Sequence, residues 1–228
     1  MKICIAGRTG LVGNAVVRKA MMNPMFTRVV VLSRRPLPED IESHRKVRVV
    51  LHDDFGVWPT RVLDTLVGCR ACIWAVGGDA SPFAGLTTAW RVGSEYVLCA
   101  AVALHKALGH VQPPGHKFQF VFVSRGYKEH RFGSSVRLST TRLIKSDAER
   151  RLREFQWQHL DTFKLNIARP CKVIKAGGGP LRVLIRKVFG GIDEERLARS
   201  LLNLARGDFL DLYYEEDELN KIGRYDVA

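Results

Sequence analysis

A doubly wound parallel α/β sheet is the architecture expected for these 228 residues, and three observations lead to it. Short apolar runs alternate with longer segments of helical periodicity over most of the chain. The apolar runs are nearly continuous rather than alternating, which is typical of strands whose two faces are both covered. A glycine-rich turn, GRTGLVG at 7–13, directly follows the first apolar run. Helices on both faces of one parallel sheet account for all three features.

The expected strands are six apolar runs, each bounded by polar or turn residues. They are KICIA at 2–6, RVVVLS at 28–33, VRVVLH at 47–52, ACIWAV at 71–76, FQFVFVS at 118–124 and TFKLNIA at 162–168. The expected helices cover 11–22, about 58–67, about 86–108 with Gly109 as its C-terminal cap, and about 140–155. Another helical pattern lies at 181–189, after AGGGP. We interpret it as a helix that packs on the surface of the domain. Binding of its basic face to a membrane or an acidic partner is the alternative.

One domain is expected to span 1–228. A chain of this length with 46% hydrophobic residues buries a sizeable core. Residues 1–170 are expected to form the sheet core, and residues 171–228 a small elaboration on the substrate side. The apolar stretch after Lys2 ends at Ala6, which is too short for a signal peptide. The longest apolar run, 96–104, is about half of the roughly 20 residues of a spanning helix. A soluble, cytoplasmic protein is therefore expected.

The net charge of +13 calls for an anionic partner or for a solubility role. Lysine and arginine are dispersed, with modest clusters at SHRK and ERRLREF and no tract of five or more. Dispersed charge is typical of a solvated face, so the sequence argues against dedicated nucleic-acid recognition. Part of the excess charge is expected to attract the phosphates of a cofactor or an acidic substrate.

Five cysteines without a secretory segment indicate reduced thiols rather than a disulfide framework. The pair in CRAC, Cys69 and Cys72, has the spacing of a redox or zinc half-site. No second pair completes that site, and the motif lies at the entry of an apolar strand. Two packed thiols are therefore the preferred interpretation, and no metal site is predicted.

The three glycines of GRTGLVG have the context that a dinucleotide site requires. A strand precedes them, a helix follows, and a second strand begins about twenty residues later. Because glycines have no Cβ atom, the backbone amides of such a turn can come close to a pyrophosphate. The partial positive charge at the N-terminus of the following helix also attracts this anion. A tight turn alone is the alternative. The expected cofactor-binding residues here are Gly7, Arg8, Thr9, Gly10, Leu11 and Gly13.

The end of the second strand predicts which nucleotide binds. An NAD site ordinarily carries an acidic residue here, which binds the ribose hydroxyls. This strand ends in Ser33, Arg34 and Arg35, whose guanidinium groups complement a 2′-phosphate, with Arg8 as a third cation. NADP(H) is therefore the predicted cofactor, and two exposed arginines without this role are the alternative. After the third strand, a carboxylate of Asp53 or Asp54 is expected to reach the adenine amino group.

The motifs, in their order and spacing, resemble the atypical and extended short-chain dehydrogenase/reductases, and more narrowly the NmrA-like and Tat-interacting-oxidoreductase-like branch. The stretches that carry the resemblance are GRTGLVG, VVVLSRRP, DDF, RVGSEYVL, FVFVS, ARP and LARSLLNLARGD. They span almost the whole chain. The resemblance implies a Rossmann-like fold, a nicotinamide cofactor, a small-molecule substrate and pairing through helices 86–108 and 140–155. Those helices have apolar faces that equally suit packing on the sheet.

The family implies a Ser at the end of the fifth strand and a Tyr four residues before a Lys on the next helix. Ser124 and Lys145 occupy two of these positions, but Thr141 stands where the tyrosine is expected. The i, i+4 spacing keeps Thr141 and Lys145 on one helical face. An aliphatic hydroxyl is a far poorer acid than a phenol, so hydride transfer is expected to be slower but not forbidden. Lys145 is expected to bind the nicotinamide ribose. The alternative is that Lys145 is an ordinary surface lysine.

Two tyrosines are candidates to replace the missing phenol. Tyr127 lies three residues beyond Ser124, and Tyr96 lies on the helix at 86–108. His130 is in the same loop as Tyr127 and titrates near neutrality, but a lone loop histidine is typically solvent-exposed. The predicted catalytic set is Ser124, Thr141, Lys145 and Tyr127.

Three functions fit these residues. The first is an NADP(H)-dependent reductase acting on a small carbonyl, imine or activated alkene. The second is a non-redox protein that keeps the nucleotide site as a sensor or partner-binding module. The third is an isomerase or dehydratase that reuses the pocket for acid/base work. The substrate pocket is expected to come largely from residues after Pro170, including 176–184 and 211–219. The acidic run Glu215 to Glu218 is expected to balance arginines or to cap a helix.

Overall fold

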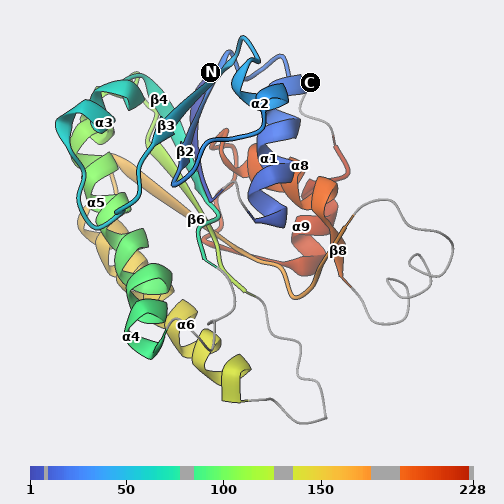
Figure 1. Cartoon of the computed structure of the whole chain (residues 1–228). Coiled ribbons are helices and arrows are strands. Elements are labelled where there is room, and N and C mark those ends of the chain that lie inside the picture. Colours follow the sequence, from blue (N-terminus) through green and yellow to red (C-terminus); the bar gives the residue numbers. More distant parts are fainter. Residues whose placement is uncertain (8–9, 78–84, 126–135, 176–190, 226–228) are drawn as a thin grey trace, which may run out of the picture.

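A seven-stranded sheet forms the centre of the protein (Figure 1). The computed structural model describes residues 1–7, 10–77, 85–125, 136–175 and 191–225, with side chains described from residue 140 onward in the helix that begins at 136. The strand order is β3-β2-β1-β4-β5-β6-β9, and every neighbouring pair is parallel. The predicted doubly wound parallel sheet is confirmed.

The strands of this sheet agree closely with the predicted runs, with two corrections. They are β1 (Lys2–Ala6), β2 (Arg28–Ser33), β3 (Val47–Leu51), β4 (Cys69–Trp74), β5 (Phe118–Val123), β6 (Phe163–Arg169) and β9 (Tyr213–Glu215). β4 begins and ends two residues earlier than 71–76, because its pairing with β1 runs from Cys69 to Trp74. β9, predicted as part of a pocket segment, adds a parallel edge strand beside β6. A separate pair joins β7 (Val173–Ile174) to β8 (Ile192–Asp193).

The described helices follow the predicted order and extend it. They are α1 (Leu11–Met22), α2 (Glu39–Glu42), α3 (Thr60–Leu66), α4 (Gly85–Trp90), η1 (Arg91–Glu95), α5 (Tyr96–Leu108), η2 (Gly109–Val111), α6 (Val136–Gln158), α8 (Glu194–Leu204) and α9 (Glu216–Ile222). The predicted helix at 86–108 is thus interrupted by a π-helical turn, η1, and α6 begins four residues before the predicted start. The predicted helix at 181–189 lies outside the described residues.

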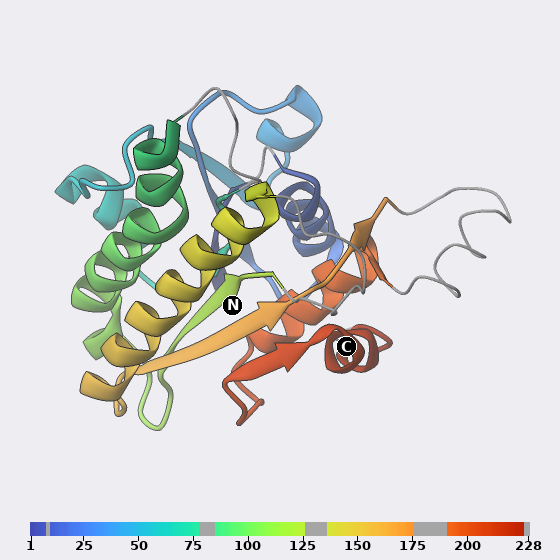
Figure 2. The same cartoon turned by 90° about the horizontal axis from the view of Figure 1, so that it is seen from below.

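Helices cover both faces of the sheet, as Figure 2 shows. Because side chains alternate along a strand, Ile3 and Ile5 contribute to one core with α1, α8 and α9. Cys4 and Ala6 contribute to the other core, with α3, α5 and α6. The predicted apolar faces of α5 and α6 pack on this second side of the sheet. None of the helices in the described ranges combines the length and hydropathy that crossing a bilayer requires.

Close packing explains two glycines near α5. Gly109 is the C-terminal cap of α5, as predicted: its amide donates a hydrogen bond to the carbonyl of His105. Its φ is −59°, and the chain continues into η2. A Cβ at Gly109 would lie 2.4 Å from the ring of His105. A Cβ at Gly93, in the π-helical turn, would lie 2.4 Å from Ile144 of α6. Glycine at these sites lets α5 hold a buried imidazole and lets η1 approach α6.

His105 is a buried imidazole held in its neutral form. Its Nε2 lies 2.8 Å from the hydroxyl of Thr162, and its ring lies 4.3 Å from His159 and 5.2 Å from His110. Burial and these two neighbouring imidazoles lower the pKa of His105 from 6.5 to about 4. Between these two values the unfolded chain binds a proton that the folded chain does not.

The free energy of unfolding is therefore expected to fall as the pH drops from about 6.5 toward 4. Urea unfolding of the protein and of His105→Gln at several pH values measures this. The variant should lose less stability over this window, whereas a control, His116→Gln at an exposed loop position, should match the parent. An equal acid loss in all three proteins would exclude His105 as the cause.

The cysteines are thiols, as predicted. All five lie within the described residues and are free, and Cys69 and Cys72 are buried in the sheet. Cys72 faces Cys4 on the neighbouring strand β1. The described residues hold no group of three or more metal-ligating side chains. CRAC is therefore a packing motif here.

Candidate functional site

Two adjoining pockets lie where the sheet reverses its strand order, between β1 and β4. Their volumes are about 370 Å³ and 290 Å³. They share the start of α1 at Gly10 and the residues that follow β4, Ala75, Val76 and Gly77. A crevice at the carboxyl ends of the strands, at this reversal, is the usual ligand site of an open parallel sheet.

The glycine turn brings β1 and β4 into close contact at this crevice. Gly7 has a φ of +93°, and a Cβ there would lie 2.3 Å from the backbone carbonyl of Ala75. Gly10, in contrast, faces open space, because its Cβ would meet only the carbonyl of Gly7 at 3.7 Å. Gly10 precedes α1, whose first turn carries no acidic residue. Such an open helix N-terminus beside a glycine turn suits a pyrophosphate. The predicted contacts Arg8 and Thr9 lie outside the described residues.

The smaller pocket extends from the glycines to the end of β2. Its other lining residues are Leu32, Ser33, Arg34, Phe55 and Val92. The hydroxyl of Ser33 donates a 2.7 Å hydrogen bond to the carbonyl of Arg35 and so closes the turn after β2. Arg34 is exposed and lines the pocket, whereas Arg35 is exposed without lining it. No carboxylate is among the described residues that line this pocket.

The two predicted adenine contacts lie beside this pocket rather than in its lining. Asp53 is exposed, and Asp54 accepts hydrogen bonds from the amide of Gly56 at 2.9 Å and from Arg91 at 3.2 Å. The Gly56 bond, followed by one from the Tyr96 hydroxyl, lowers the pKa of Asp54. Burial and the same bond raise the pKa of Tyr96. Tyr96, a candidate substitute acid, thus donates a hydrogen bond to Asp54 and is a weaker acid than a free phenol.

The larger pocket brings together the three described residues of the predicted catalytic set. Ser124, at the end of β5, lies opposite Thr141 and Lys145, which are one turn apart on α6. All three are buried, with exposed fractions of 7%, 5% and 8%. The remaining lining residues are Gly10, Leu11, Val12, Gly13, Ala75, Val76, Gly77, Val123, Arg125, Pro170, Cys171, Lys172 and Val173. Tyr127 and His130 lie outside the described residues.

Lys145 is a buried cation whose charge is weakly stabilised by its described neighbours. Its Nζ donates a 3.3 Å hydrogen bond to the carbonyl of Val123 and lies 4.7 Å from the centre of the Phe122 ring. It forms no salt bridge with any residue that the structure describes. Burial lowers the pKa of Lys145 to about 8, although the charge of Glu149 opposes this shift. The surface-lysine alternative is therefore wrong.

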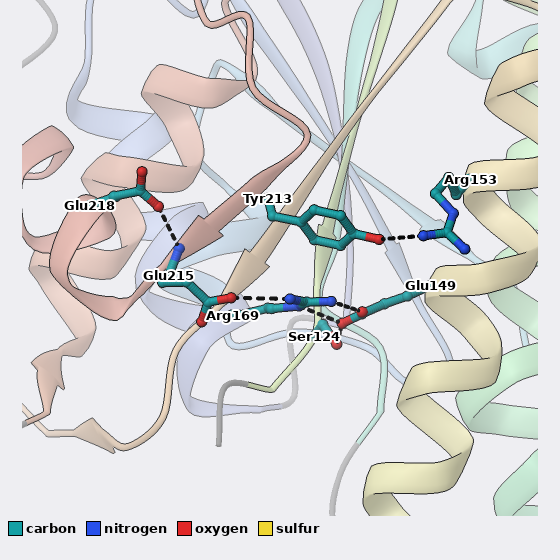
Figure 3. A network of polar contacts seen from close by, with 7 residues as sticks. All are labelled: Ser124, Glu149, Arg153, Arg169, Tyr213, Glu215 and Glu218. Carbon is teal, nitrogen blue, oxygen red and sulfur yellow. Dashed lines mark hydrogen bonds and ion pairs between the residues drawn. The ribbon is translucent and has the colours of Figure 1, made fainter. Parts of the chain in front are cut away.

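A chain of polar contacts runs from Ser124 across the end of β6 (Figure 3). The hydroxyl of Ser124 donates a hydrogen bond to Oε1 of Glu149, one turn after Lys145 on α6. Arg169, the last residue of β6, donates to both carboxylate oxygens of Glu149, from Nε at 3.1 Å and from Nη2. The pair is bidentate and largely buried, since the side chains of Arg169 and Glu149 are 28% and 9% exposed.

The same network continues to β9 and to the C-terminal helix. Arg169 donates to Glu215 at 3.1 Å and lies 4.0 Å from the centre of the Tyr213 ring. Figure 3 also shows the hydroxyl of Tyr213 beside Arg153 of α6, at 3.4 Å. Glu215 and Glu218 form a capping box at the start of α9. The acidic run thus balances an arginine and caps a helix, as predicted.

Three described residues of the C-terminal segment line the larger pocket. These are Cys171, Lys172 and Val173, and the other described lining residues are Pro170 and residues before it. Residues 213–222 form β9 and α9 instead of a pocket wall. Buried Glu216 of α9 accepts hydrogen bonds from the amides of Cys171, Lys172 and Gly191, and so fixes the chain beside the pocket. The predicted segment 176–184 lies outside the described residues.

Sequence reasoning missed two residues of the site, Glu149 and Arg169. Glu149 stands in the charged stretch KSDAERR, which is typical of a solvated helix face. Its i, i+4 spacing from Lys145, and eight-residue spacing from Thr141, nevertheless place all three on one face of α6. Arg169 was visible only as part of the ARP motif after the sixth strand. The spacing on α6 was the signal available for Glu149.

Solved structures share the fold of this chain at low sequence identity. A short-chain dehydrogenase/reductase from Saccharomyces cerevisiae aligns with a TM-score of 0.71 and 14% identity, over 97% of this chain and 99% of the other. An oxidoreductase of the same family from Burkholderia thailandensis aligns with a TM-score of 0.66 and 16% identity, over 96% and 92%. A double mutant of dTDP-glucose 4,6-dehydratase from Streptomyces venezuelae, solved with NAD bound, aligns with a TM-score of 0.68 and 16% identity, over 95% and 75%.

Sequence comparison adds no closer relative. No protein-family model matches the sequence, and no curated protein matches it. The structural likeness therefore establishes a Rossmann-like α/β fold for this chain.

Proposed function

We propose that this protein is an NADP(H)-dependent oxidoreductase of the atypical short-chain dehydrogenase/reductase type, in its NmrA-like branch, acting on a small carbonyl, imine or activated alkene. One observation carries the proposal: Ser124, Thr141 and Lys145 line a single pocket that adjoins the glycine turn. The solved structures of similar fold include short-chain dehydrogenase/reductases and an NAD-bound dehydratase, which supports a nicotinamide cofactor.

The residues at the crevice suit a dinucleotide. The open space at Gly10 and the first amides of α1 would hold the pyrophosphate, and Arg34 would hold a 2′-phosphate. The nicotinamide end would extend into the larger pocket, where Lys145 is placed to bind its ribose. When bound in its reduced form, the cofactor supplies a hydride to the substrate.

The cofactor preference is expected to depend on Arg34 and Arg35. Their replacement in Arg34→Ala/Arg35→Ala should weaken NADPH binding by about 10- to 100-fold, because each charge-assisted hydrogen bond is worth roughly 1.5 to 3 kcal/mol. NADH binding should change by less than about threefold, since NADH has no 2′-phosphate. Titrations followed by nicotinamide fluorescence measure both affinities.

A matched control is Arg206→Ala, an exposed arginine that lines a pocket with Gln119 and Lys164, away from the glycine turn. It should leave both affinities unchanged. An equal loss of NADPH and NADH binding in the double variant would mean that the arginines attract both nucleotides through their positive charge and do not bind the 2′-phosphate specifically.

A non-redox function is the second candidate, and Thr141 is the observation that favours it. A threonine cannot supply the phenolic acid that the resembled family uses. The candidate functions without hydride transfer are nucleotide sensing and isomerase or dehydratase chemistry.

Turnover separates these candidates. Purified protein is mixed with NADPH and a panel of small aldehydes, ketones, imines and activated alkenes, while the absorbance of the reduced nicotinamide is followed. Substrate-dependent loss of absorbance supports the reductase. Tight NADPH binding without turnover of any compound would overturn the reductase and support the non-redox candidate.

A further inference from the structure

We propose that Lys145 itself delivers the proton to the substrate oxygen, and that the Glu149–Arg169 pair is the positioning element that leaves Lys145 free to do so. This inference rests on the proposed reductase function and specifies its proton donor. It departs from the expectation that this lysine only binds ribose and assists a neighbouring phenol.

The hydroxyl of Ser124 already has a fixed acceptor for its proton. It donates to Glu149, whose carboxylate is held by two hydrogen bonds from Arg169. An ionised carboxylate can only accept hydrogen bonds, so turning this hydroxyl toward a substrate carbonyl would break a charge-assisted bond in a buried site. Ser124 therefore presents its lone pairs to the pocket, where it can accept a hydrogen bond but has no proton to offer.

The other proton-bearing groups of the pocket are less suited than Lys145. Arg125 does not give up a proton at any physiological pH, and the hydroxyl of Thr141 is a very weak acid. Lys172 also lines the pocket, but its side chain is exposed to solvent, so it lacks the burial that Lys145 has. Cys171 carries a thiol, which is the remaining acidic group among the described lining residues, and its substitution tests that alternative.

Lys145 is placed for this role by three structural elements. From β5, the carbonyl of Val123 accepts one of its hydrogen bonds, and the ring of Phe122 lies beneath its Nζ. From the end of β4, Gly77 comes so close that a Cβ there would lie 3.0 Å from Nζ. Thr141 and Glu149 flank it on α6. Burial in this setting lowers the pKa of Lys145 to about 8, which suits an ammonium that must release a proton near neutrality.

Arg169 prevents Glu149 from capturing this ammonium. Both carboxylate oxygens of Glu149 face the guanidinium, and no salt bridge between Glu149 and Lys145 is present. A direct salt bridge would hold the proton on Lys145 and oppose its transfer. The Glu149–Arg169 pair therefore orients Ser124 and keeps the carboxylate away from Lys145.

The reaction balances with these groups. The carbonyl carbon gains a hydride from the reduced nicotinamide, and the π electrons of the C=O bond move to the oxygen. That oxygen takes a proton from the ammonium of Lys145 and becomes a hydroxyl, which can then donate a hydrogen bond to Ser124. The products are an alcohol, the oxidised nicotinamide and a neutral amine, which regains its proton from water.

The substitution Lys145→Arg tests this role because arginine keeps the positive charge but cannot release a proton. We expect the variant still to bind NADPH, because arginine can donate a hydrogen bond to the ribose, and to lose at least about 100-fold in kcat at saturating NADPH with nitrobenzaldehyde or phenanthrenequinone. Retained turnover, within about tenfold, would overturn the inference and leave Lys145 a ribose-binding residue. Loss of turnover in Cys171→Ser with an active Lys145→Arg would assign the proton to the thiol instead.

A second measurement does not depend on turnover. Competitive labelling with trace acetic anhydride, read by mass spectrometry of the Lys145 peptide, reports the fraction of neutral amine at each pH. We expect half-maximal reactivity near pH 8 in the intact protein. A midpoint above about 10, the value of an ordinary lysine, would overturn the inference. Failure of the wild-type protein to bind NADPH would instead overturn the proposed function, whatever the labelling shows.

Discussion

Replacing Arg169 by methionine is expected to lower the free energy of unfolding by about 3 to 5 kcal/mol, the range for stripping a buried charge of its partner. Glu149 would then be left in a buried site with only the hydroxyl of Ser124 as its described hydrogen-bond donor. The contacts of the guanidinium with Glu215 and with the ring of Tyr213 would be lost as well. Urea unfolding at neutral pH measures the loss.

The loss of unfolding free energy should differ between the two members of the ion pair. In Glu149→Leu, Arg169 keeps Glu215 at 3.1 Å and keeps its partial access to solvent, so the loss should be smaller. The double variant should be less destabilised than the sum of the two single variants, because it leaves no unpaired buried charge. Additive losses, or a loss below about 0.5 kcal/mol in Arg169→Met, would show that the pair is not coupled in solution.

Gly7→Ala is the second change with a large expected effect. A Cβ at Gly7 would lie 2.3 Å from the backbone of Ala75, and its φ of +93° is strained for any residue with a side chain. The left-handed conformation alone costs roughly 1 to 2 kcal/mol, and the clash forces β1 and β4 apart at the crevice. We expect loss of NADPH binding together with a lowered midpoint of thermal unfolding.

Gly10→Ala is the matched comparison, since a Cβ there meets nothing closer than 3.7 Å. Its φ of −84° is open to alanine, so the protein should fold normally. NADPH binding should nevertheless fall by about tenfold or more, because the methyl group would occupy space that the pyrophosphate needs. Normal binding by both variants would mean that the nucleotide does not lie at the glycine turn.

The sheet was predictable because its strands are near-continuous apolar runs that only burial on both faces explains. The exceptions have physical causes. β9 has three residues in an acidic stretch, and its pairing with β6 is a long-range contact that no local pattern encodes. The π-helical turn at 91–95 contains Gly93, where a Cβ would lie 2.4 Å from Ile144 of α6, and no local pattern encodes this contact between helices.

The site was predictable where it follows local spacing. The i, i+4 pair on α6 and the end of β5 place Thr141, Lys145 and Ser124, and the structure brings these three into one pocket. The ion pair of Glu149 with Arg169 joins residues 20 positions apart on different elements. Its members resemble ordinary surface charges in the sequence, because burial appears only when α6 packs beside β6.

The most direct test of the account is a calorimetric titration of the purified protein with NADPH and, separately, with NADH. We expect binding of one NADPH per chain, at least about tenfold tighter than NADH, because Arg34 lines the pocket at the end of β2 and no described lining residue of that pocket is a carboxylate. Absence of binding by either nucleotide at about millimolar concentration would contradict it, and would leave the glycine turn as a structural feature of the fold.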